Sequence, residues 1–259
     1  MDFKPISLDI DGREEKLSKI KRYVHERFPL MFYRTDDLIH SKRVRYHLED
    51  AAEDIFFVYG KGFDFDYART LAEVHDDLEI LEGDTTLFEK ERMSQEELSS
   101  LEKGELNSIP KFLEEYGDFV NGYNYEGLLL DAKTKGSIEA KFVSFFDKYD
   151  GGGEAWHEVW ASNQDFVLPA GGKNGMTGGY IRRLNEFPRK YLHMKNFFEI
   201  FPEYLPEPFD FKSAADKGKL HALESLKEDS GFPLYERWKK TIIEREGIEN
   251  LIVPVEFRT

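Results

Sequence analysis

The chain has 259 residues, of which 40% are hydrophobic and 15% aromatic, with a formal charge of -15 and no cysteine. This length can bury a substantial core in one domain with additions; the lack of cysteine excludes disulfides and thiolate metal sites, and the negative charge argues against binding to nucleic acid polymers. No apolar run approaches the roughly 20 residues of a membrane span and the first residues lack a signal-peptide apolar region, so we expect a cytoplasmic protein that does not bind membranes.

Apolar residues at helical spacing predict a first helix over residues 12–27, which ends before Pro29. Two arginines follow, Arg27 and Arg34. A guanidinium near a metal site can bind a phosphate through two hydrogen bonds, but each arginine can equally be a surface or ion-paired residue.

A second helical pattern covers residues 41–60, and His40 stands in or just before its first turn, after a cluster of cap-forming residues. A third predicted helix, over residues 66–82, contains the adjacent pair His75 and Asp76 and then Glu79, four residues after the histidine. That spacing would place His75 and Glu79 on one helical face. Asp77 and Glu82 are expected on the solvated face of this helix.

The acid-rich stretch after His75 is the strongest chemical signal in the chain, because His75 and Asp76 offer a nitrogen and an oxygen ligand to one divalent cation. A catalytic ion needs further protein ligands. His40 is one candidate, and Asp147 is another because it ends an apolar run, where a carboxylate needs a cationic partner. These four residues could hold one ion of Mn, Co, Mg, Zn or Fe, since mixed nitrogen and oxygen ligands do not select the metal.

Residues 85–136 resemble a charge-rich insertion. Residues 94–97 carry a capping-box pattern at a helix start, a second short helix is expected over 109–119, and a loop at 117–127 could reach over the site.

Residues 138–163 read as a helix that carries Asp147, with Asp150 as the alternative ligand and His157 as a structural histidine. The glycine triplet at 151–153 either breaks this helix or marks close packing of its backbone, since each helical glycine costs roughly 1 kcal/mol relative to alanine. No Lys-Ser or Lys-Thr pair follows the triplet, so a phosphate-binding loop of the Walker type is excluded.

Residues 166–259 are expected to form a mostly helical C-terminal extension, with a flexible loop at 171–179 and a strand-like end at 251–257. The extension would pack on the core or take part in contacts of a homodimer.

The order of these residues resembles the HD-domain metal-dependent phosphohydrolases, and within them the 5'-deoxynucleotidase branch. Four blocks over about residues 20–165 carry the likeness: the Arg27-Phe28-Pro29-Leu30-Met31 run, the Arg34 to Ser41 segment with His40, the His75-Asp76-x-x-Glu79 motif with Gly83-Asp84, and Asp147 followed sixteen residues later by Asn163. Phe28 stands where that branch carries tryptophan.

The resemblance implies an all-α HD-domain helical bundle over residues 1–165, with the insertion at about 85–136 and the extension at 166–259. It implies a phosphohydrolase that acts on nucleotides, first of all on (deoxy)nucleoside 5'-monophosphates. His40, His75, Asp76 and Asp147 would bind a single divalent metal ion, since the chain lacks the additional histidines between His75 and His157 of two-metal relatives. The spacing to Asn163 favours Asp147 over Asp150.

The resemblance also assigns roles around the metal. Glu79 and Asp84 would be catalytic, as general acid or in orienting the attacking water, and Arg27, Phe28 and Arg34 would bind the substrate. Two alternatives remain: an HD hydrolase of nucleoside triphosphates or another small phosphoester, and a nucleotide-binding protein without catalysis.

Overall fold

The computed structural model describes residues 1, 3–6, 8, 10–23, 35–83, 85, 87–167, 175–218 and 223–252. Within these ranges the chain is all-α, as predicted, except for a two-stranded antiparallel sheet of β1 (Phe119–Val120) and β2 (Tyr123–Asn124). Most of the strand-like end at 251–257 lies outside the described residues, and Leu251 belongs to a 3₁₀ turn. Across the described part of the chain, no helix is both long and apolar enough to cross a bilayer.

The helices before the sheet are α1 (Arg13–Leu17), α2 (Asp37–Asp50), α3 (Ala52–Tyr59), α4 (Phe65–Val74), α5 (Glu79–Glu82), α6 (Leu87–Arg92) and α7 (Gln95–Tyr116). The helices after it are α8 (Tyr125–Thr134), α9 (Ile138–Trp160), α10 (Met176–Lys190), α11 (Leu192–Ile200), α12 (Phe211–Lys217) and α13 (Pro233–Glu246). Short 3₁₀ turns at 60–62, 164–166, 202–204, 223–227 and 248–251 join or follow them.

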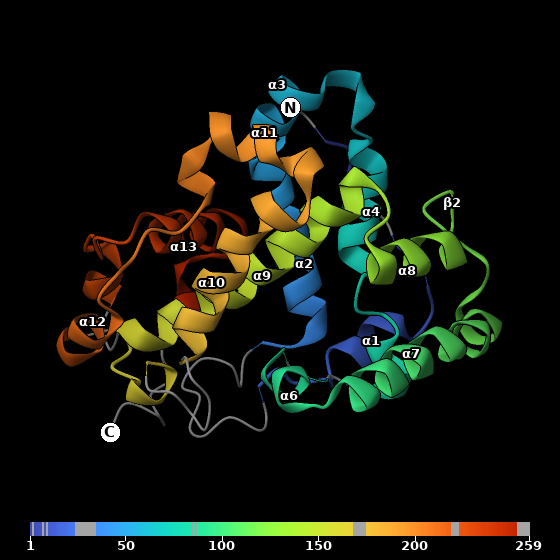
Figure 1. Ribbon diagram of the computed structural model, residues 1–259, viewed down its shortest axis with the longest axis horizontal. Coiled ribbons are helices and arrows are strands. Elements are labelled where there is room, and N and C mark those ends of the chain that lie inside the picture. Colours follow the sequence, from blue (N-terminus) through green and yellow to red (C-terminus); the bar gives the residue numbers. More distant parts are fainter. Residues whose placement is uncertain are drawn as a thin grey trace.

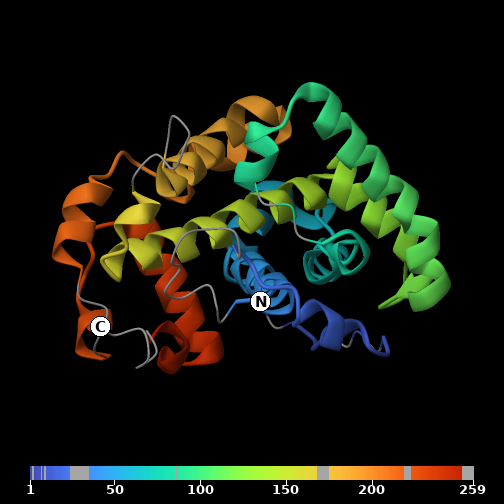
Figure 2. The ribbon, with the colours of Figure 1, turned by 90° about the horizontal axis from the view of Figure 1, so that it is seen from below.

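Helix α9 runs through the middle of the molecule in both views (Figures 1 and 2). It packs against α2 and α4 from the N-terminal part of the chain and against α10, α12 and α13 from the C-terminal part. Helices α7 and α8 lie at the opposite end of the molecule from α12 and α13. The residues after 166 therefore share the central helix with the N-terminal helices.

Helix α9 continues through its three glycines, and aromatic side chains occupy the space where their Cβ atoms would lie. A Cβ atom added at Gly151 would lie 2.6 Å from the Tyr180 hydroxyl, and one added at Gly153 would lie 2.2 Å from the Trp238 ring. Both distances are too short for non-bonded atoms. Close packing is therefore the correct one of the two interpretations of the triplet.

Two predicted helices are shorter than their patterns indicated. Within residues 12–23, the described part of the first predicted helix, only α1 is helical, and Tyr23 has a φ of 58°. The helix predicted over 66–82 is interrupted between α4 and α5 by i to i+3 hydrogen bonds, such as Asp77 N to Val74 O at 3.1 Å and Glu79 N to Asp76 O at 2.9 Å. His75 and Asp76 therefore lie in a turn instead of on one continuous helical face.

In the predicted insertion, a helix is longer than expected, because a single helix replaces the two that the sequence predicted. Helix α7 passes through Pro110 and ends only at Tyr116. Its capping box at Ser94 and Glu97 is confirmed, since each side chain accepts a hydrogen bond from the other residue's backbone.

Candidate metal centre

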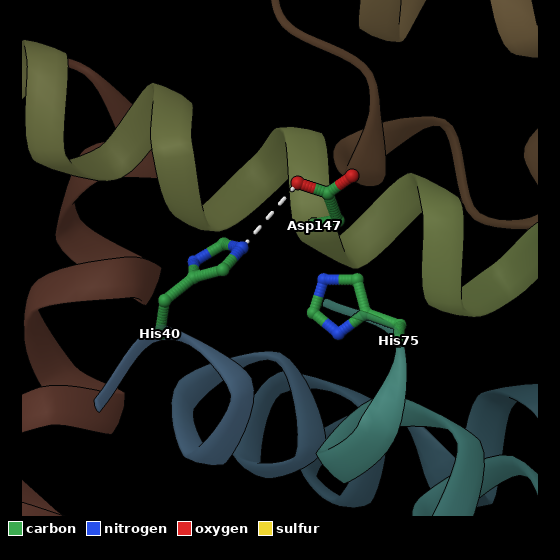
Figure 3. Close-up of side chains that lie close together, drawn as sticks. All are labelled: His40, His75 and Asp147. Carbon is green, nitrogen blue, oxygen red and sulfur yellow. Dashed lines mark ion pairs between the residues drawn. The ribbon is translucent and has the colours of Figure 1, made fainter. Parts of the chain in front are cut away.

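Two histidines and one aspartate from three separate elements meet beside α9 (Figure 3). His40 lies in the first turn of α2, His75 directly follows α4, and Asp147 lies in α9. One ligand atom of each residue lies within 4.8 Å of those of the other two. Within this group, His40 Nε2 lies 3.4 Å from Asp147 Oδ1, the ion pair marked in Figure 3.

Asp76 lies at the same place. Its Oδ2 atom is 3.2 Å from His75 Nε2 and 3.7 Å from His40 Nε2. The structure thus brings together all four residues that the sequence predicted as metal ligands. Asp76 also belongs to a second group, with Asp37 and Glu79, whose carboxylate oxygens lie within 4.8 Å of one another.

Local hydrogen bonds hold the two imidazoles in position. The Asp36 side chain caps α2 by accepting from the Ile39 amide at 3.0 Å, which fixes the turn that carries His40. His75 Nδ1 donates to the Ala72 carbonyl at 2.9 Å. This bond leaves His75 Nε2 as the atom that points to Asp76.

Asp150 contacts His40 on the side that is turned away from Asp147. Its buried carboxylate lies 2.8 Å from His40 Nδ1, and it also accepts from Trp238 Nε1 at 2.7 Å and lies 3.1 Å from His47 Nε2. Metal-binding histidines commonly present their second nitrogen to a carboxylate in this way. Asp150, the alternative ligand by sequence, therefore contacts the face of His40 that is turned away from Asp147.

The four residues fit a divalent cation. His40 Nε2 and His75 Nε2 are both buried, and neither has a hydrogen-bond partner among the described residues. Leaving a buried polar atom unsatisfied costs free energy, which a cation between the two nitrogens would remove. Two imidazole nitrogens and two carboxylates form a donor set that suits several divalent metals, so the metal's identity stays open.

The charges around the site determine which of the candidate ligands carries a proton before a metal ion binds. Burial and the Arg22 charge oppose protonation of His40, but Asp147 and Asp150 outweigh them and raise its pKa to about 9. Burial lowers the pKa of His75. Burial alone would raise the pKa of Asp147, but Lys148 and the two histidines hold it well below its usual range. A metal ion would therefore enter between charged carboxylates and displace the proton of His40.

Arg22 is a residue of this site that the sequence did not indicate. Its guanidinium lies 3.8 Å from Asp37, 4.0 Å from Asp76 and 3.4 Å from Glu154, and its side chain is 11% exposed. Arg22 lies within the predicted first helix, and helical spacing gives no sign that it turns toward residues of α2 and α9.

The site opens into a cavity of about 930 Å³. Part of its wall consists of Arg22, His75, Asp76, Glu79 and Asp147. Helices α7, α8, α9 and α10 supply most of the remaining described wall. Within the described lining, the loop at 117–127 contributes no residue, whereas α7 contributes several.

The remaining predicted site residues have different outcomes. Arg27, Phe28, Arg34 and Asp84 lie outside the described residues. Glu79 lines the cavity, and His157 is buried between the Tyr235 hydroxyl and the Leu251 carbonyl, away from the metal candidates.

The prediction that Asp77 lies on a solvated face is wrong. Asp77 is fully buried, and its carboxylate accepts hydrogen bonds of 2.7 and 2.6 Å from Arg13 and a further one from the Tyr125 hydroxyl. The Arg13 guanidinium offsets the free-energy cost of burying this carboxylate. The local sequence pattern around Asp77 does not reveal this partner. Glu82 is exposed, as expected.

Comparisons with models of protein families, with curated proteins and with solved structures find no match for this chain. We therefore infer the function from the residues themselves and from their geometry.

Proposed function

We propose that this chain is a metal-dependent phosphohydrolase of the HD type that removes phosphate from nucleotides. One observation supports the proposal more than any other: four side chains of the expected ligand types, far apart in sequence, meet beside a cavity of about 930 Å³. Cavities of roughly 300–1,000 Å³ are typical of small-molecule sites.

In this proposal, His40 and His75 would hold the ion through their Nε2 atoms, and Asp76 and Asp147 would hold it through carboxylate oxygens. A divalent ion supplies positive charge to a phosphoryl group and lowers the pKa of a water molecule. Asp150 keeps His40 in the correct orientation through the 2.8 Å contact with Nδ1.

Arg22 and Glu79 supply the remaining chemistry. The Arg22 guanidinium, on the cavity wall, offers hydrogen bonds to phosphoryl oxygens. Glu79, on the same wall, accepts a proton from the attacking water. The water oxygen bonds to phosphorus, the bond from phosphorus to the ester oxygen breaks, and Glu79 returns the proton to that leaving oxygen. Asp84 is the alternative carboxylate for this step.

The cavity also offers room for the organic part of a nucleotide. Apolar side chains of α7, α9 and α10 contribute to its lining, among them Leu98, Leu101, Val143 and Phe187. Such surfaces bury a base, whereas the polar groups fix its phosphate. The resemblance makes (deoxy)nucleoside 5'-monophosphates the first substrates to test.

Phosphate release from nucleoside mono-, di- and triphosphates, with Mn, Co or Mg added, tests the proposal. We expect wild type to release phosphate, and Asp76→Ala and Glu79→Ala to lose at least 100-fold in rate while they stay folded. Glu82→Ala is the matched control, because Glu82 is an exposed acid of the same segment, and it should keep the wild-type rate. Full activity of Asp76→Ala would refute the metal mechanism. A wild type that binds nucleotides without turnover in any metal would favour the non-catalytic alternative.

A further inference from the structure

The cavity contains a cationic region beside the metal candidates. Away from Arg22 and the acids of the metal centre, its described lining has six cationic side chains against the three carboxylates of Glu102, Glu105 and Glu186. The six are Lys90, Lys133, Lys135, Lys148, Arg183 and Lys190. The chain as a whole has a formal charge of -15, so this local excess of positive charge runs against its overall balance.

Acids neutralise only part of this region. Glu105 is shared by two lysines, since its carboxylate lies 3.1 Å from Lys133 and 3.5 Å from Lys90. Lys148 forms its ion pair with Asp147, a metal candidate, and would lose part of that attraction when a cation binds Asp147.

Two further lysines have no carboxylate partner within the described residues. The Lys135 ammonium approaches the Lys133 carbonyl at 3.5 Å, and the Lys190 ammonium lies 5.2 Å from the centre of the Tyr191 ring. Each of these lysines can therefore neutralise an anion in the cavity.

The backbone at Lys135 is unusual for a lysine. This residue ends α8 in the left-handed conformation, with φ 54° and ψ 45°, where glycine is favoured. The dipole of a helix favours lysines at helix ends, such as Lys133 and Lys190, and Lys135, which is half-buried, directly follows the end of α8. Burial, then the charge of Lys148, lowers the pKa of Lys135 to about 8.

We propose that Lys135, Lys148 and Lys190 bind a phosphate group other than the one that is hydrolysed, so that the preferred substrate carries at least two phosphates. These three residues come from the end of α8, from α9 and from the end of α10, and all line the cavity that contains Asp147. The statement about the substrate rests on the proposed phosphohydrolase function, whereas binding of phosphate groups by the lysines does not. It favours nucleoside di- or triphosphates over the monophosphates that the resemblance suggests.

Calorimetric titration of the metal-free protein with inorganic pyrophosphate, in EDTA, tests this site without turnover. We expect Lys135→Gly and Lys190→Met each to weaken pyrophosphate binding at least tenfold. Glycine suits the positive φ of position 135, so the first variant should stay folded, and Lys190 is exposed. Lys195→Met is the matched control, because Lys195 is an exposed lysine of α11 that pairs with Glu199, and it should bind as wild type does.

Two outcomes would overturn the site: no binding of pyrophosphate by wild type, or equal binding by wild type and both cluster variants. A second titration, with inorganic phosphate, separates the two sources of the ligand. Pyrophosphate should bind at least tenfold more tightly, and equal affinities would show that the lysines bind free phosphate, which overturns the statement about the substrate. Lysine-dependent binding in a protein without turnover would support the site and reject the phosphohydrolase function. Turnover, together with pyrophosphate binding that neither lysine substitution weakens, would support the phosphohydrolase function and reject the lysine site.

Discussion

The substitution Asp150→Asn tests whether the carboxylate behind His40 supports metal binding. Asp150 is fully buried and contacts His40 Nδ1 at 2.8 Å, His47 Nε2 at 3.1 Å and Trp238 Nε1 at 2.7 Å. Asparagine keeps the shape of the side chain but removes the charge. Loss of such a partner typically weakens metal binding by about 10–100-fold, or ~1.4–2.8 kcal/mol.

The assay is calorimetric titration of the metal-free proteins with Mn or Co, together with thermal unfolding in EDTA. We expect Asp150→Asn to bind metal about 10–100-fold more weakly than wild type, with the same stoichiometry. Glu49→Gln is the matched control. Glu49 is a buried acid of α2, but among the described residues its ion pairs are with Arg45, Arg69 and Arg245, and none is with a histidine. Wild-type affinity in a folded Asp150→Asn protein would refute the positioning role of Asp150.

Two further predictions concern stability. Gly153→Ala should lower the free energy of unfolding by roughly 3 kcal/mol, since its Cβ would lie 2.2 Å from the Trp238 ring, whereas Gly104→Ala, with nothing within 4 Å, should raise it by ~0.5–1 kcal/mol; equal effects in urea denaturation would contradict this packing. Burial lowers the pKa of His157 from 6.5 to about 3, so the unfolded chain takes up its proton first and stability should fall as pH decreases from 6.5 toward 3, by at most ~1.4 kcal/mol per pH unit. His157→Gln should show a shallower decrease over that pH range, and an unchanged slope would contradict burial of the neutral imidazole.

The sequence predicts the all-α class well because apolar residues at helical spacing, caps and breaks are local signals. His40 illustrates this, since the cap that starts its helix, Asp36, lies four residues before it. The glycine triplet in α9 is different. Its two interpretations were separated only by Tyr180 and Trp238, which are distant in sequence and fill the space beside the glycines.

Local patterns separate neighbouring acids poorly. Asp147 and Asp150 are three residues apart on α9, so both face α2, and they contact opposite nitrogens of His40. Asp77 appeared to be a surface acid because its partner, Arg13, lies 64 residues away in the chain.

Two cationic residues of the cavity wall, Arg22 and Lys135, were missed from sequence. Arg22 and Lys135 come from segments whose local patterns suggested packing or an insertion, and only the tertiary fold places them on the cavity wall. These cationic side chains are distant from one another in sequence, and they come together only where several helices pack around the cavity.

The most direct test of the account is the stoichiometry of metal binding, measured by titrating the metal-free protein with Mn or Co. We expect one ion per chain in wild type and in His193→Ala, an exposed histidine of α11, and no such binding in His75→Ala or Asp147→Ala. If His75→Ala and Asp147→Ala bind one ion with wild-type affinity, the metal does not lie between His40, His75, Asp76 and Asp147, and the proposed function loses its basis.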